Sequence, residues 1–85
     1  MNVVPSQLTL YTRIGCHLCD DMKEQLEILQ QQYQFSLNIV DIDADNDNYL
    51  RLRYGERVPV LAGGEQEICH YFLNQELLLN YLNSF

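Results

Sequence analysis

The fold of this chain is decided by the stretch Leu10-Tyr11-Thr12-Arg13-Ile14-Gly15-Cys16-His17-Leu18-Cys19. It opens as a strand, in which Leu8, Leu10 and Thr12 lie on one side, and it closes as the start of a helix. Gly15 breaks the strand, so the two cysteines that follow stand at a strand-to-helix junction. A helix start offers unpaired backbone N–H groups and a partial positive charge. The sequence therefore places a close pair of thiols where a thiolate is favoured.

The segments after the cysteines predict a helix, a strand and a second helix. From His17 to about Tyr33 the apolar residues recur on one helix face, namely Leu18, Met22, Leu26 and Leu29. Alternating apolar residues then predict a strand from Phe35 to Ile39, and the acidic run 41–48 is expected to cap a short helix over 47–54. Gly55 is placed to end that helix.

The last third of the chain predicts a hairpin and a final helix. Strands over Val58–Ala62 and Glu65–Tyr71 are joined by a turn at Gly63-Gly64, which makes them antiparallel. Asn74 has the pattern of an N-cap, with Leu73 and Leu78 spaced as a hydrophobic staple. The apolar face of this helix consists of Leu77, Leu78, Tyr81 and Leu82.

Taken together, the elements follow the order β-α-β-α-β-β-α in an α/β chain of 85 residues. The first two strands are joined through a helix, so we expect them to be parallel with a right-handed crossover. The result is a mixed four-stranded sheet with three helices, which is the layout of the minimal thioredoxin-like fold. Because the chain is short and shows no linker, we expect residues 1–85 to form a single domain.

Composition excludes several classes of function. The net charge is −7, from 12 acidic and 5 basic residues. Nucleic acids and anionic membrane surfaces attract basic proteins, so we expect no nucleic-acid and no membrane partner. We see no signal peptide and no apolar run of membrane-spanning length, and we expect a cytoplasmic protein. In a reducing compartment a close cysteine pair is more often catalytic or metal-binding than structural.

The cysteine pair allows two kinds of chemistry. In a redox mechanism Cys16, nearer the helix start, is the nucleophile, and Cys19, one turn on, resolves the mixed disulfide. The C-x-x-C spacing is also half of a zinc site, which Cys69 and His70 could complete. Neighbours on a strand point to opposite faces, so one of these two could reach the pair, but hardly both. We expect Cys69 to lie in the core and His70 to face the other way.

Several charged residues surround the pair. Arg13 either adds positive charge near the thiolate or is a solvated surface residue. His17, when protonated, could stabilise a thiolate, or it has no role. Asp20 and Asp21 suit the first turns of a helix, but their charge opposes thiolate formation. Among the six tyrosines, Tyr11 and Tyr71 could border the site.

With these residues in hand, the chain from Leu8 onward resembles the glutaredoxin-like branch of the thioredoxin superfamily. Arg13 falls where glutaredoxins usually carry lysine, and Arg57-Val58-Pro59-Val60 is similar to their Thr-Val-Pro segment. The resemblance implies a cis Pro59 facing the cysteine pair, and a Val58 backbone that pairs with an extended substrate. It also implies a dithiol–disulfide oxidoreductase that acts on protein or low-molecular-weight disulfides through Cys16 and Cys19. An external thiol or reductase supplies the electrons, and we expect no bound cofactor and no metal.

Departures from the glutaredoxin pattern weaken the case for glutathione as the reductant. The dipeptide between the cysteines is His-Leu rather than Pro-Tyr. Tyr71-Phe72-Leu73 stands where glutaredoxins place a Gly-Gly pair near the glutathione carboxylate. Two other functions remain open: a metal or iron–sulfur module that uses the same cysteines, and a non-catalytic adaptor that binds a peptide along Val58-Pro59.

Overall fold

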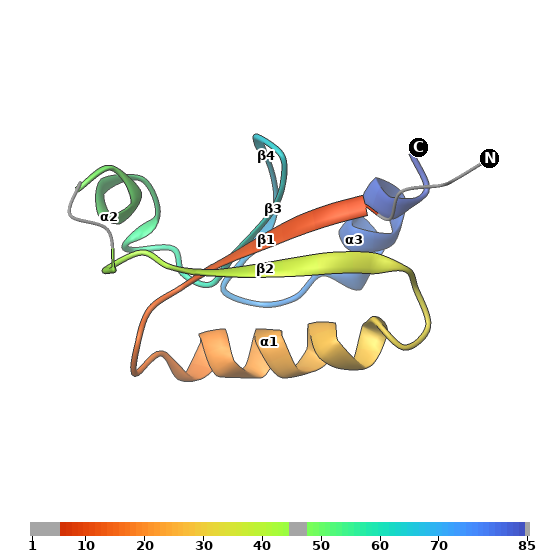
Figure 1. The fold of residues 1–85 in the computed structure, drawn as a ribbon, viewed down its shortest axis with the longest axis horizontal. Helices are drawn as coiled ribbons and strands as arrows, with labels where there is room; N and C mark the ends of the chain where they lie inside the picture. Colours follow the sequence, from red (N-terminus) through yellow and green to blue (C-terminus); the bar gives the residue numbers. More distant parts are fainter. Residues whose placement is uncertain (1–5, 45–47, 85) are drawn as a thin grey trace.

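The computed structural model describes residues 6–44 and 48–84. The elements follow the expected order: β1 (Ser6–Thr12), α1 (His17–Leu29), β2 (Phe35–Asp41), α2 (Tyr49–Tyr54), β3 (Val60–Gly63), β4 (Gln66–His70) and α3 (Gln75–Leu82). The four strands form one sheet in the order β2-β1-β3-β4 (Figure 1). β1 is parallel to β2 and antiparallel to β3, and β3 is antiparallel to β4. This is the predicted mixed α/β sheet with three helices.

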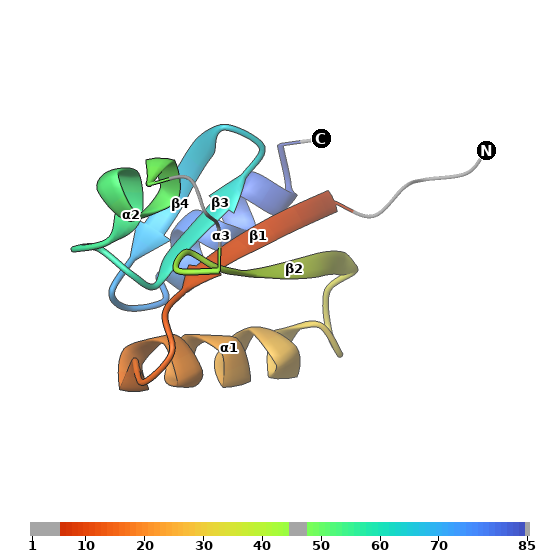
Figure 2. The same ribbon diagram turned by 60° about the vertical axis from the view of Figure 1, so that its left-hand side comes forward.

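Two apolar clusters occupy the two faces of the sheet. Alternation along β1 sends Leu8 and Leu10 to one face, where they pack with residues of α1 and α3. Tyr11 points to the other face and stacks on Tyr54 of α2, with ring centroids 4.2 Å apart. Figures 1 and 2 show α1 and α2 on opposite sides of the sheet. No helix of the described residues is long and apolar enough to cross a membrane.

The first helix is shorter than predicted, and its predicted apolar face is confirmed except that Leu18 is less buried than Cys19. It begins at His17 as expected but ends at Leu29, four residues before Tyr33, because the chain tightens through Gln31 and Gln32 to reach β2. Its buried residues are Cys19, Met22 and Leu26, and Leu18 is only half-buried. At 3.6 residues per turn, position 19 completes the stripe of 22 and 26 better than position 18 does.

The strand bounds also differ at the hairpin. β3 begins at Val60 rather than Val58, because Pro59 has no N–H to contribute to the ladder. β4 ends at His70 rather than Tyr71, whose φ of 64° takes the chain out of extended conformation. The capping prediction for the last helix is confirmed, since the Asn74 side chain accepts a hydrogen bond from the backbone N–H of Leu77.

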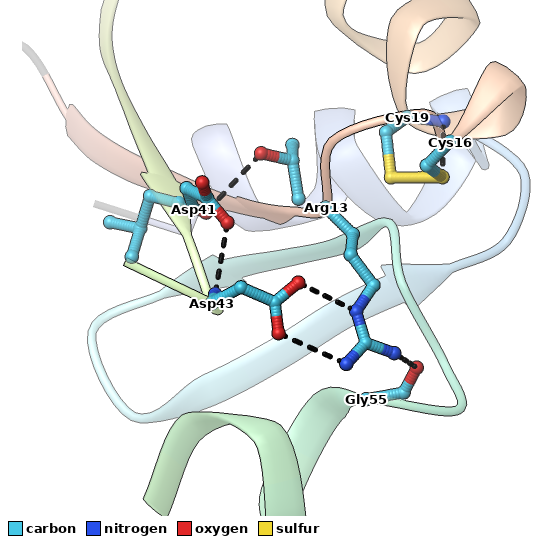
Figure 3. Close-up of polar contacts among 8 residues, drawn as sticks. Arg13, Cys16, Cys19, Asp41, Asp43 and Gly55 are labelled. Carbon is cyan, nitrogen blue, oxygen red and sulfur yellow. Dashed lines mark hydrogen bonds and ion pairs between the residues drawn. A yellow bond between two sulfur atoms is a disulfide. The ribbon is translucent and has the colours of Figure 1, made fainter. Parts of the chain in front are cut away.

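The acidic run does not cap α2 through the residues that the structure describes. The N-cap is Asn48, which makes no side-chain capping bond, and Asp47 lies outside the described residues. Asp43 instead accepts two hydrogen bonds from Arg13, from Nε at 2.8 Å and from Nη2 at 3.0 Å. Arg13 Nη1 donates to the Gly55 carbonyl at 3.2 Å (Figure 3). This Arg13 clamp, made of Arg13, Asp43 and Gly55, ties the end of β1 to the segments around α2.

Replacing Leu61 with alanine tests the core. Leu61 is fully buried in the cluster that α1 and α3 cover, so Leu61→Ala should lower the free energy of unfolding by about 2–5 kcal/mol. Chemical denaturation followed by circular dichroism measures this loss. Leu52→Ala is the matched control, because Leu52 is 85% exposed and its removal should cost less than about 0.5 kcal/mol. Equal losses would contradict the packing described above.

Replacing Asp43 with asparagine tests the Arg13 clamp. The hydrogen bonds from Arg13 hold the pKa of Asp43 below its ordinary value of 3.8. A depressed carboxyl pKa stabilises the fold above that ordinary value, and the contribution is lost as pH falls through the folded pKa. Asp43→Asn should therefore lower stability at pH 7, and the difference from wild type should shrink in strong acid and in high salt. Unfolding curves at several pH values measure it, with Glu27→Gln on α1 as the control. A difference that is independent of pH would argue against the clamp.

Candidate functional site

The cysteine pair follows β1 at the end of the sheet where β1 and β2 end and β3 begins. Thr12 is paired with Asp41, and Tyr11 is paired with both Val40 and Val60. Because β3 runs antiparallel to β1, the residues just before Val60 lie level with the end of β1. The loop to Cys16 and the Val58-Pro59 segment therefore lie at the same end of the strands.

Gly15 and Cys16 make the turn into α1. Gly15 has a φ of 81°, in the left-handed region that favours glycine, and a Cβ there would meet nothing within 4 Å. The glycine is thus required by its backbone conformation and not by close packing. Cys16 follows as the N-cap of α1, with extended dihedral angles. Its Sγ accepts a hydrogen bond from the backbone N–H of Cys19 at 3.1 Å.

Cys16 and Cys19 are joined by a disulfide, with their Cα atoms 5.2 Å apart (Figure 3). The two sulfurs differ in access, since Cys16 is half-buried whereas Cys19 is only 2% exposed. Ile14, two residues before Cys16, is 88% exposed. Cys16 is therefore the more accessible residue of the pair.

The Arg13 guanidinium is directed away from the disulfide and toward the Arg13 clamp (Figure 3). The hydrogen bonds to Asp43 raise the pKa of Arg13 further above its already high ordinary value. The sequence left open whether Arg13 adds positive charge near the thiolate or is a surface residue, and the structure shows its guanidinium paired with Asp43. These contacts connect the loop that carries the cysteines to Asp43 and to Gly55. His17 is exposed at the first position of α1, beside Cys16.

The peptide bond between Val58 and Pro59 is cis. Pro59 is fully buried, and its carbonyl accepts a hydrogen bond from the backbone N–H of Tyr71 at 2.9 Å. Just before this segment, Arg57 is ion-paired with Glu67 of β4. Val58 lies outside the strands, and its backbone N–H and C=O make no hydrogen bond with the described part of the chain.

Tyr71 and Phe72 follow β4, and the structure gives Tyr71 a backbone conformation and contacts that the sequence did not predict. Tyr71 is the one non-glycine residue of the described ranges with a positive φ, a conformation that costs about 1–2 kcal/mol. It is held by its N–H bond to Pro59 and by its hydroxyl, which donates to the Glu56 carbonyl at 2.8 Å. With Phe72 and Leu73 it faces Leu18 across a small pocket. Tyr11, by contrast, stacks on Tyr54 under α2.

Cys69 and His70 do not join the pair. Cys69 is buried in the main core, where burial raises the pKa of its thiol. His70 is exposed, and its Nδ1 lies 2.9 Å from a carboxylate oxygen of Glu67. Within residues 6–44 and 48–84, no group of three or more histidine, cysteine or acidic side chains could hold a metal ion.

The chain matches a family model and is similar to solved structures of other proteins. A family model described as glutaredoxin-like domain (DUF836) matches residues 7–83. The solution structure of protein Ne2328 from Nitrosomonas europaea is 42% identical, with a TM-score of 0.82 over 96% of each chain. Protein XcR50 from X. campestris is 35% identical, with a TM-score of 0.65 over 92% of this chain and 97% of that one.

Two proteins with lower sequence identity also match the chain. A glutaredoxin from Archaeoglobus fulgidus is similar in fold, with a TM-score of 0.57 at 17% identity over 94% of this chain and 88% of that one. The uncharacterized protein Rv0508 of Mycobacterium tuberculosis is 29% identical over 85% of this chain and 77% of its own length. With the match over 7–83, these findings identify the chain as a member of the glutaredoxin-like domain family (DUF836), with a redox-type thioredoxin fold and a C-x-x-C cysteine pair.

Proposed function

We propose that this protein is a dithiol–disulfide oxidoreductase that exchanges electrons with protein or low-molecular-weight disulfides through Cys16 and Cys19. The observation that supports this most strongly is the unequal access of two bonded sulfurs at one helix start. The accessible Cys16 is suited to attack a substrate, and the shielded Cys19 is suited to displace it. A purely structural disulfide has no need of this asymmetry.

The start of α1 supplies the stabilisation that a Cys16 thiolate requires. In the reduced protein, the N–H of Cys19 that now points at Cys16 Sγ can donate to the thiolate, and the helix dipole adds to this attraction. Arg13 makes no direct contribution, because its guanidinium is bound to Asp43 and Gly55. Asp20, in the first turn, opposes the thiolate. We therefore attribute thiolate stabilisation to the helix terminus itself.

The proposed cycle is balanced in atoms and electrons. The Cys16 thiolate attacks one sulfur of the substrate disulfide, that S–S bond breaks, and the departing sulfur takes a proton from water. Cys19 then loses its proton and attacks Cys16 Sγ, which forms the Cys16–Cys19 disulfide and releases the second substrate thiol. Two electrons have passed to the substrate. An external low-molecular-weight thiol or dithiol reductase returns them, which suits a reducing compartment such as the cytoplasm.

The segment before β3 offers the substrate a place to bind. Val58 lies at the same end of the strands as the loop to Cys16, and its backbone N–H and C=O make no hydrogen bond with the described part of the chain. An extended chain could pair with Val58 through main-chain hydrogen bonds just before β3 begins.

Serine substitutions separate the roles of the two cysteines. Cys16→Ser should abolish disulfide reduction, because the nucleophile is lost, whereas Cys19→Ser should still attack and accumulate a mixed disulfide on Cys16. Non-reducing mass spectrometry after mixing with a model disulfide detects the adduct, and thiol release measures turnover. Cys69→Ala is the control and should remain active, because Cys69 lies in the core. Full turnover by Cys16→Ser would refute the mechanism.

A further inference from the structure

A pocket of about 140 Å³ opens between the first turns of α1 and the turn that follows β4. We call it the Phe72 pocket; its lining is Leu18, Asp21, Met22, Gln25, Tyr71, Phe72 and Leu73. Leu18 lies between the two cysteines in the sequence, and Met22 follows Cys19 by one helical turn. A cavity of about 150 Å³ can hold a benzene molecule, so this pocket matches the size of one apolar side chain.

The wall of the Phe72 pocket is continuous with the proposed docking segment. Tyr71, which lines the pocket, is bound through its N–H to Pro59 and through its hydroxyl to Glu56, so the pocket wall is attached directly to the residues on either side of Val58. Phe72, which also lines the pocket, is 69% exposed. A chain paired with Val58 could therefore place a neighbouring side chain in the pocket while its disulfide meets Cys16.

The charge around the pocket is negative. Asp21 is the charged residue among those that line it, and Arg13 offers no free cation because Asp43 binds it. The chain as a whole carries a net charge of −7. A substrate segment with a lysine or arginine would be attracted to this surface, and an anionic one would be repelled.

We propose that the Phe72 pocket selects protein disulfides whose cysteine is flanked by an apolar residue and a basic residue. The apolar side chain enters between Leu18 and Phe72, and the basic side chain lies near Asp21. This inference rests on the proposed function and names its substrate class. It also gives a reason why an anionic low-molecular-weight disulfide such as oxidised glutathione should be a poor substrate.

Single-turnover kinetics with matched peptides test the proposal. Pre-reduced protein is mixed with symmetrical peptide disulfides built on Leu-Cys-Lys, Ser-Cys-Lys or Leu-Cys-Glu, or with oxidised glutathione. Formation of the Cys16–Cys19 disulfide is followed by alkylation and mass spectrometry. Each rate constant is divided by that of dithiothreitol with the same disulfide, which removes differences in intrinsic reactivity. We expect the normalised rate constant of the Leu-Cys-Lys disulfide to be about tenfold higher than that of Ser-Cys-Lys. It should be about threefold higher than that of Leu-Cys-Glu. Oxidised glutathione should be slower than the Leu-Cys-Lys disulfide.

Variants assign each preference to its residue. Phe72→Ser and Tyr71→Gly should each reduce the Leu-to-Ser ratio toward one. Glycine also suits the left-handed conformation at position 71, so the backbone there is preserved. Asp21→Lys should reverse the Lys-to-Glu ratio. The controls are Leu52→Ser, which changes an exposed leucine of α2, and Glu27→Lys, which changes an exposed acid farther along α1; both should keep the wild-type ratios. Each ratio compares two rate constants of the same variant, so a loss of folded protein affects both equally and leaves the ratio unchanged.

The outcomes separate this inference from the proposed function. If every disulfide oxidises the wild-type protein with ratios near one, or if oxidised glutathione reacts as fast as the Leu-Cys-Lys disulfide, the pocket has no selective role and the inference is overturned. The proposed function would then still stand. If no disulfide produces a Cys16–Cys19 bond, the proposed function fails and this inference fails with it.

Discussion

The hydrogen bond from the backbone N–H of Cys19 to Cys16 Sγ is the interaction on which the site depends. It makes Cys16 the N-cap of α1, so the residue that begins the helix is also the one proposed to react. The left-handed turn at Gly15 and the Arg13 clamp fix the loop that leads into this cap. Burial of Cys19 with Met22 and Leu26 then fixes the helix against the sheet. Folding and the proposed chemistry thus rely on the same few contacts.

Local pattern was sufficient to predict the order of the elements. Alternation in β1, the helical spacing after Cys16 and the Asn74 cap each depend on neighbours within a few residues, and each agrees with the structure. The predicted helix face is confirmed at Met22, Leu26 and Leu29, whereas Leu18 is only half-buried and Cys19 is buried more deeply than it is. Cysteine is itself an apolar residue that is often buried, so the signal was present in the sequence.

Contacts between distant segments were beyond sequence reasoning. Arg13 and Asp43 are separated by 30 positions, and only the pairing of β1 with β2 brings them together. The positive φ of Tyr71 was equally hidden, because nothing in the local sequence favours it over the extended form expected there. Tertiary hydrogen bonds to Pro59 and Glu56 hold that conformation. Both features depend on contacts between segments that are far apart in the sequence.

The central claim is that Cys16 and Cys19 form a reversible redox couple. The most direct measurement equilibrates the protein in graded mixtures of reduced and oxidised glutathione, traps free thiols by alkylation and reads them by mass spectrometry. The account predicts one Cys16–Cys19 disulfide that forms and breaks with a single midpoint, while the buried Cys69 stays a thiol throughout. Absence of a Cys16–Cys19 disulfide at every glutathione ratio would contradict the account.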